Sequence, residues 1–334
     1  MNDRPSARHS TGRFFLSQQK ADHLHMHSLK SFFTDRLKSD LILLLAAIVW
    51  GGGFVAQRSA SSHLGFFAFN GVRFLLGGLV MLPFVIKRLR NKPGQLFWIL
   101  PAGAILFAGS SLQQAGITTT SAGTAGFITG IYVVLVPLLM TLFWKHKTKP
   151  VIWFAALAAL GGTYLLSTGG AELTPSKGNL IVLVGSLVWA FHVIVVGFAV
   201  KKVDVFVFSV GQFLFCGLLH LVSSIFVNPP TWAAIQVSWP SILYAGLGSV
   251  VIGFTLQAVG QRKAPASDAA LILSLESVFA AIFGALILAE TMNFIQIVGC
   301  VIILAAIVVA QLPAFQPKAE ESDPPAKSQT GMVS

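Results

Sequence analysis

The sequence predicts an all-α integral membrane protein with ten transmembrane helices, arranged as two inverted five-helix repeats. Three observations lead to this fold class. The chain of 334 residues is 54% hydrophobic and only 10% charged, whereas a soluble protein carries about 25% charged residues. Ten apolar stretches follow one another along the chain. The first five stretches also resemble the last five in the spacing of their aromatic and polar residues.

The apolar stretches begin after a polar N-terminal segment and continue almost to the C-terminus. They occupy residues 41–57, 66–86, 96–116, 121–144, 151–168, 179–200, 205–227, 237–260, 267–288 and 294–312. About 20 helical residues cross a hydrocarbon core of roughly 30 Å. Backbone groups in lipid need partners within the protein, so continuously apolar runs of this length predict helices. A membrane β-barrel would alternate apolar and polar residues instead.

The basic residues are placed asymmetrically between the two sides of the membrane. Of the 23 Lys and Arg residues, 20 fall in the N-terminal segment, the C-terminal segment or the loops after the second, fourth, sixth and eighth stretches. The positive-inside rule therefore places both termini in the cytoplasm, with the protein in the inner (plasma) membrane. The net charge of +11 does not predict nucleic-acid binding, because these residues are spread thinly and form no dense basic stripe.

The two ends of the chain read as polar cytoplasmic tails. Residues 1–39 contain no apolar core of a secretory signal, and residues 316–334 are polar and Pro-rich. The N-terminal segment carries His23, His25 and His27, which could bind a metal ion loosely. We interpret the segment as a disordered tail. The sequence predicts no resident metal and no cofactor.

The two halves of the membrane region share a repeated pattern. An offset of 139 residues aligns Trp50 with Trp189 and Arg73 with Gln212, and an offset of 144 aligns Tyr132 with Glu276. We therefore predict one five-helix repeat over residues 40–169 and a second over 178–312. Because five is odd, the second repeat enters the membrane upside down, as in many secondary transporters.

Several short stretches resemble the EamA family of the drug/metabolite transporter superfamily. They are Ala47-Ile48-Val49-Trp50-Gly51, Phe69-Asn70-Gly71-Val72-Arg73-Phe74, Leu273-Ser274-Leu275-Glu276 and Leu288-Ala289-Glu290-Thr291, followed by Gln296 and Gly299. The resemblance covers both repeats. It implies a ten-helix carrier, often an exporter, with a central cavity between the halves. Family members often have proline after the glutamate of the ninth helix, where this chain has Ser277, so no proline kink is predicted there.

Two charged residues within the apolar stretches are the first candidates for function, because a charge at a helix centre costs about 2.5 kcal/mol or more. Arg73 could bind an anionic group of a solute, or reach the outer interface and serve as an anchor. Glu276 could load and release a proton, or accept hydrogen bonds between helices. A direct Arg73–Glu276 ion pair is a further hypothesis.

Polar and aromatic residues supply candidate walls for a cavity. They are Trp50, Trp189, His192, Tyr132 and Gln257, joined by the amides Gln113, Gln114 and Gln212. Indole rings offer an aromatic face to a solute, and histidine can exchange a proton. The alternative for each is a packing or hydrogen-bonding role. A cavity lined by amides and aromatic rings would suit a zwitterionic or mildly polar solute.

These features predict a secondary transporter that moves a small metabolite, amino acid or drug-like solute by alternating access. Its predicted partners are that solute, membrane lipid and a counter-flux of protons or solute. The chain has no Gly-rich phosphate loop with lysine and no recognised hydrolase motif, so we predict that it is not an enzyme. Two alternatives are an integral-membrane enzyme acting on a lipid or lipid-linked substrate, and a non-transporting receptor or scaffold. The sequence leaves the oligomeric state open.

Overall fold

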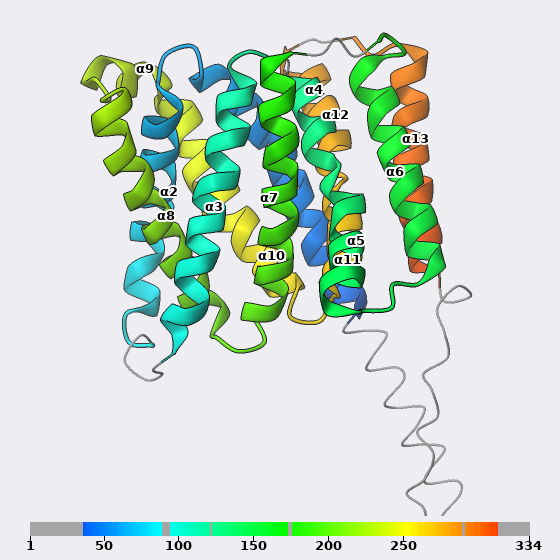
Figure 1. Ribbon diagram of the computed structural model, residues 1–334. Coiled ribbons are helices and arrows are strands. Elements are labelled where there is room, and N and C mark those ends of the chain that lie inside the picture. The colour runs from blue at the N-terminus through cyan, green and yellow to red at the C-terminus, as the bar shows by residue number, and fades with distance from the viewer. Residues whose placement is uncertain (1–35, 89–93, 121, 173–175, 289–290, 313–334) are drawn as a thin grey trace, which may run out of the picture.

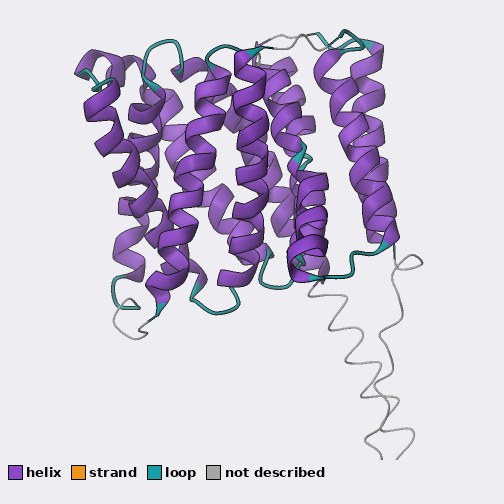
Figure 2. Cartoon of the chain, in the orientation of Figure 1, coloured by secondary structure: helices purple, strands orange, loops and turns teal. Residues whose placement is uncertain are grey.

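The structure is a computed structural model that describes residues 36–88, 94–120, 122–172, 176–288 and 291–312. Within these ranges, ten helices are long and apolar enough to cross a membrane, and no residue forms a strand. The helices stand side by side between two loop-bearing faces (Figures 1 and 2). The all-α prediction of ten membrane-spanning helices is therefore confirmed. The His run and most of both predicted tails lie outside the described residues.

Seven of the ten spans are unbroken helices. They are the first helix (Arg36–Ala60), α2 (Phe66–Val85), α3 (Gln95–Ile117), α6 (Pro150–Thr168), α7 (Lys177–Ala199), α8 (Val205–Val227) and α13 (Phe294–Gln311). The other three spans each consist of several segments. They are α4 (Ala122–Gly130) with α5 (Tyr132–Trp144), α9 (Trp232–Leu243) with the π-helix η2 (Tyr244–Phe254) and α10 (Thr255–Gly260), and α11 (Ala266–Leu273) with α12 (Glu276–Leu288).

Local capping chemistry fixes where several helices begin. The side chain of Ser176 accepts a hydrogen bond from the backbone N–H of residue 179 at the start of α7. The carboxylate of Asp204 accepts from the backbone N–H groups of residues 206 and 207 at the start of α8. Thr231 caps α9, and Asn293 forms a capping box at the start of α13. Pro150 is the first residue of α6, where its missing N–H costs no hydrogen bond.

The two ends of the described chain lie on the same face. Arg36, at the start of the first helix, donates to Gln311 Oε1 at 3.2 Å, at the end of α13. The same guanidinium pairs with Asp268 Oδ2 at 2.7 Å, near the start of α11. Because successive spans alternate in direction, the loops after α2, α5, α7 and α10 open on this face as well (Figure 1). These four loops carry 11 of the 23 basic residues.

Helices α2 and α8 show the inverted relationship of the two repeats directly. A Cβ added at Gly78 of α2 would lie 2.6 Å from Leu214 Cδ2 of α8, and one added at Gly217 of α8 would lie 2.9 Å from Leu75 Cγ of α2. Leu214 and Gly217 are the 139-residue equivalents of Leu75 and Gly78. Each helix thus presents the same glycine and leucine to the other, as two-fold-related surfaces do.

Helices α6 and α13 pack closely side by side at one end of the bundle (Figure 1). Their backbones meet at Gly162 and Gly299. A Cβ at Gly162 would lie 2.7 Å from the Gly299 carbonyl oxygen and 3.1 Å from the Ile303 nitrogen. Backbone atoms cannot rotate away as a side chain can, so this contact requires glycine. The neighbouring Gly161 is exposed, and a Cβ there would meet nothing within 4 Å.

We therefore expect Gly162→Ala to destabilise the protein and Gly161→Ala to leave it unchanged or slightly stabilised. Overpacking of a close contact costs about 1–3 kcal/mol, whereas replacing an exposed helical glycine by alanine gains up to about 1 kcal/mol. Thermal unfolding of both variants in the same detergent measures the difference. Equal melting temperatures for the two variants would show that α6 and α13 do not depend on this contact.

Candidate functional site

A cavity lies at the centre of the bundle, where helices of both repeats converge. Its lining residues come from seven of the ten spans and are Trp50, Phe54, Gln57, Arg73, Gln113, Thr129, Tyr132, Trp189, His192, Val193, Ser249, Phe254, Gln257 and Glu276. The cavity volume open to the centres of water molecules is about 50 Å³. At about 10–15 Å³ for each water, this is room for roughly three to five waters. A larger solute would have to move these side chains to enter.

All seven residues that the sequence put forward as binding or coupling candidates line this one cavity. They are Arg73, Glu276, Trp50, Trp189, His192, Tyr132 and Gln257. The neutral amide of Gln113 also reaches it. Two other amides do not. Gln114 donates instead to the Gln57 backbone carbonyl at 3.0 Å, and Gln212 lies behind His192.

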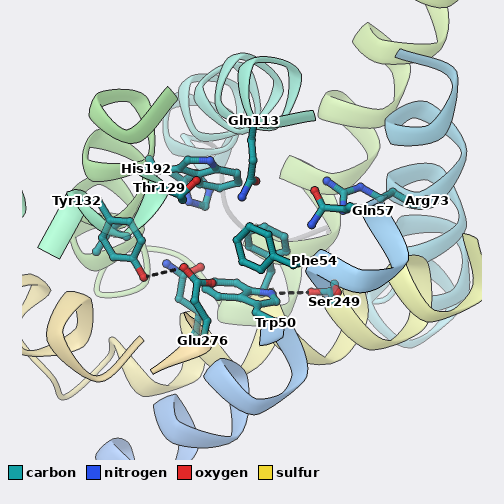
Figure 3. A pocket seen from close by; sticks show the side chains of 14 residues that line it. Trp50, Phe54, Gln57, Arg73, Gln113, Thr129, Tyr132, His192, Ser249 and Glu276 are labelled. Carbon is teal, nitrogen blue, oxygen red and sulfur yellow. Dashed lines mark hydrogen bonds between the residues drawn. The ribbon is translucent and has the colours of Figure 1, made fainter. Parts of the chain in front are cut away.

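Glu276 and Tyr132 meet where two spans are interrupted, between α4 and α5 and between α11 and α12. Tyr132 is the first residue of α5 and Glu276 the first residue of α12. The Tyr132 hydroxyl donates to Glu276 Oε1 at 3.3 Å, and both side chains are buried (Figure 3). Since these positions are equivalent in the two repeats, the bond joins the break of one repeat to the break of the other. Interrupted helices of this kind hold the solute or ion sites of many secondary transporters.

Serine side chains accompany the break before α12, where no proline is present. The Ser274 hydroxyl donates to the Leu271 carbonyl at 2.7 Å, and the Ser277 hydroxyl donates to the Ser274 carbonyl at 2.8 Å. Backbone bonds there also span three residues rather than four, as from Leu275 N–H to the Ile272 carbonyl at 3.1 Å. Serine hydroxyls that bond to nearby carbonyls compete with the regular helix ladder. The span is therefore interrupted without a proline at position 277.

Arg73 reaches the cavity from α2, and no acidic side chain of the described residues pairs with its charge. The residue is 3% exposed, and its guanidinium carbon lies 5.3 Å from the ring centre of Phe69 and 4.8 Å from that of Phe74. Its Nε is buried without a hydrogen-bond partner in the described part of the chain. The hypothesised Arg73–Glu276 ion pair is not formed there. Figure 3 shows the two side chains on opposite sides of the cavity.

Three aromatic rings form one wall of the cavity. Phe254 lies between the two tryptophans, with its ring centre 4.8 Å from Trp50 in an edge arrangement and 6.0 Å from Trp189 in a stacked one. His192 stands perpendicular to Trp189 at 5.6 Å. Its Nε2 lies 3.1 Å from Gln212 Oε1. Because an amide oxygen can only accept, Nε2 carries the proton in this bond and Nδ1 of the neutral ring is an acceptor.

The cavity wall is rich in polar atoms that have no protein partner. Those buried without a hydrogen bond among the described residues are Gln57 Oε1, Arg73 Nε, Thr129 Oγ1, Trp189 Nε1, His192 Nδ1, Ser249 Oγ, and both amide atoms of Gln257. Native interiors leave only a few such groups per hundred residues, because each one costs free energy unless it finds a partner. Eight such atoms around one space make this cavity the candidate binding site.

A second buried polar cluster ties α2, α3 and α8 together beside the cavity. His220 Nδ1 lies 2.9 Å from the Cys216 carbonyl, so this nitrogen donates. Its Nε2 therefore accepts, from Ser111 Oγ at 3.0 Å and Asn70 Nδ2 at 3.3 Å. Both ring nitrogens of His220 are thus partnered, although Asn70 Oδ1 is buried without a hydrogen bond among the described residues. The bonds of His220 link three helices, which is a structural role. In the described residues, no three His, Cys, Asp or Glu side chains lie close enough to hold a metal ion.

Sequence reasoning missed six of the lining residues. They are Phe54, Gln57, Thr129, Val193, Ser249 and Phe254. A signal for two of them was present, because Phe54 and Gln57 follow Trp50 at four and seven residues and so share its helix face. Ser249 and Phe254 had no such signal. They reach the cavity from η2, a π-helix whose wider turn changes which residues share a face.

Comparisons with known proteins agree with this architecture. A model of the EamA-like transporter family matches the chain twice, over residues 37–168 and 176–311. A protein of Archaeoglobus fulgidus, described as an uncharacterized transporter, is 31% identical over 281 residues, which cover 83% of this chain and 87% of the relative. The uncharacterized inner membrane transporter YedA of Escherichia coli is 23% identical over 273 residues, covering 80% and 89%.

One solved crystal structure, described only as that of a protein, has the same fold. It superposes with a TM-score of 0.71 at 18% identity and covers 82% of this chain and 96% of the other. The paired family match, the ten apolar helices and the named relatives lead to one conclusion. The chain belongs to the EamA-like transporter family and is a multi-pass membrane transporter.

Proposed function

We propose that this protein is a secondary transporter that carries a small metabolite, amino acid or drug-like solute across the inner (plasma) membrane by alternating access. The observation that carries the proposal is the set of unpartnered polar atoms around the central cavity. A static membrane bundle gains nothing from burying such atoms, whereas a carrier needs them to replace the hydration shell of its solute.

The position of the cavity supports alternating access. It lies where the two inverted repeats meet, and each repeat contributes a tryptophan and one residue of the Tyr132–Glu276 pair. Two equivalent halves can exchange conformations, which would open the same cavity first to one side of the membrane and then to the other. Breaks at equivalent positions in α4/α5 and α11/α12 supply points where half-helices can tilt.

The two ends of the cavity differ in charge. Arg73 would bind an anionic group of the solute, and Glu276 would either bind a cationic group or exchange a proton with the driving gradient. Both side chains are buried, at 3% and 6% exposure. Energy would come from a counter-flux of protons or solute. The excess of Lys and Arg on one face supports cytoplasmic termini.

A counterflow assay on purified protein in liposomes tests the proposal. Vesicles loaded with one unlabelled solute are diluted into a trace of the same labelled solute, using a panel of amino acids, sugars and cationic drugs. We expect transient accumulation of at least one solute class, and none in protein-free vesicles. Absence of exchange for the whole panel would count against a carrier of these solutes. Turnover of lipid headgroups by the same preparation would instead favour the membrane-enzyme alternative.

A further inference from the structure

The two repeat-related tryptophans, Trp50 and Trp189, each pack on an equivalent glycine of the opposite repeat. Trp50 of the first helix packs on Gly253 at the end of η2, where an added Cβ would overlap the indole. Trp189 of α7 packs on Gly109 of α3, where an added Cβ would lie 3.3 Å from two indole carbons. The glycines are separated by the same 144 residues that relate the third spans of the repeats. The two indoles therefore occupy equivalent environments.

Their indole N–H groups nevertheless have different partners. Trp50 Nε1 donates to the Ser249 carbonyl at 3.1 Å, four residues before its glycine (Figure 3). The equivalent carbonyl for Trp189 belongs to Ile105 of α3. No bond to it forms, and Trp189 Nε1 is buried without a partner in the described residues. This difference follows the helices, because η2 has the wide turn of a π-helix whereas α3 is α-helical throughout.

The unpartnered donor of Trp189 has an unpartnered acceptor nearby. His192 lies three residues later on α7, with its ring perpendicular to the indole and the ring centres 5.6 Å apart. Because Nε2 of His192 donates to Gln212, the buried Nδ1 is left as an acceptor without a partner. An indole nitrogen can only donate. Both side chains line the cavity, so this part of its wall carries one donor and one acceptor that have no partner among the described residues.

We propose that Trp189 and His192 form the subsite that recognises a neutral hydroxyl or carboxamide group of the solute, while Trp50 only shapes the wall. A hydroxyl or primary amide accepts one hydrogen bond and donates another, so it satisfies both groups at once. A carboxylate would satisfy the indole but leave its second oxygen facing the lone pair of His192. An aliphatic group would leave both polar atoms unpartnered. The inference rests on the transport function proposed above and specifies the chemistry of its solute.

Trp189→Phe and Trp50→Phe form a matched pair for the test. Each removes one indole N–H at equivalent positions of the two repeats and keeps an aromatic ring. The probes are L-asparagine and L-leucine, which have similar shapes but differ in a carboxamide against an isopropyl group. Counterflow in liposomes gives the half-saturation concentration of each probe for the parent and for both variants. The solute panel used for the proposed function is run on the same vesicles.

We expect the parent to prefer asparagine over leucine by about tenfold or more, which is the effect of one buried hydrogen bond at roughly 1.4 kcal/mol per tenfold. Trp189→Phe should reduce this preference to within about twofold, and Trp50→Phe should retain it. A preference that survives Trp189→Phe, or that is lost equally in both variants, would overturn the subsite. A parent that exchanges other panel solutes but neither probe, or both probes equally, would also overturn it and leave the transport proposal standing. A parent that exchanges nothing in the panel would overturn both.

A second substitution covers the case in which phenylalanine at position 189 prevents folding. Benzothienylalanine is a tryptophan isostere in which sulfur replaces the N–H, so it keeps the ring size and removes only the donor. Introduced at position 189 by stop-codon suppression, it should give the same loss of preference as Trp189→Phe. Retained preference with this isostere would show that the ring, and not its N–H, is what the solute contacts.

Discussion

Glu276→Gln is expected to abolish the pH dependence of solute flux while the protein still folds and still exchanges solute. Glutamine has nearly the shape of glutamate, and its amide oxygen can accept the Tyr132 hydroxyl in place of the carboxylate. The amide cannot bind or release a proton. If Glu276 couples transport to a proton gradient, uptake driven by an imposed gradient should fall at least about tenfold, whereas counterflow, which needs no proton, should persist.

The measurement compares gradient-driven uptake with counterflow between pH 5 and 8 in the same vesicles. Tyr132→Phe is the matched control, because it removes the hydrogen bond to Glu276 but keeps the carboxyl group. We expect this variant to retain a pH-dependent flux. A Glu276→Gln protein whose flux varies with pH as the parent's does would eliminate Glu276 as the coupling group. The carboxylate would then be assigned to solute binding or to the contact between the two helix breaks.

Arg73→Ala is expected to weaken transport of anionic and zwitterionic solutes much more than that of neutral ones. The guanidinium is buried beside the cavity, and none of the acids in the described part of the chain pairs with it, so an anionic group of the solute is the partner that its charge best fits. A hydrogen bond to a charged group contributes about 1.5–3 kcal/mol, so affinity should fall roughly 10- to 150-fold. Half-saturation concentrations for anionic and neutral solutes in one preparation provide the measurement.

Arg58→Ala controls for the loss of a cation elsewhere in the same half. The Arg58 Nη1 atom donates to the Ile117 carbonyl at 2.7 Å, at the end of α3, and the residue does not line the cavity. This variant should lose thermal stability without changing the ratio of anionic to neutral transport. If Arg73→Ala lowers the affinity for both solute classes by the same factor, Arg73 would be reassigned to anchoring α2 against Phe69 and Phe74.

Most of the architecture was predictable because its causes are local. A run such as residues 205–227 is apolar over its whole length, and a backbone in lipid has no partner but itself. The predicted stretch and α8 accordingly have the same bounds. The largest differences fall at helix ends with mixed composition, such as the first helix, which begins at Arg36 rather than at residue 41. There the ion pair between Arg36 and Asp268 adds a contact that the local sequence does not contain.

The candidate site was predictable to the extent that polarity is unusual in lipid. Arg73, Glu276 and His192 stand out in apolar stretches because a buried charge or ring nitrogen needs a compensating function. Ser249 and Thr129 do not stand out, since membrane helices use such residues for ordinary contacts. The sequence also gave no means to distinguish cavity amides from structural ones. Gln113 faces the cavity and its neighbour Gln114 does not, although the two residues are chemically identical.

The sequence by itself determined the ten helices, their alternating direction, the duplication and the short list of polar residues. Length, apolarity and the placement of charge suffice for these features, because each depends only on neighbours in the chain and on the membrane as solvent. The tertiary structure decided which of those residues share one space and which hydrogen bonds they make. Trp50 and Trp189 illustrate the reason. They are equivalent in sequence, yet the N–H of Trp50 is bonded to η2 and that of Trp189 is buried without a partner among the described residues. The reason is that a partner's position depends on the helix that packs across from it.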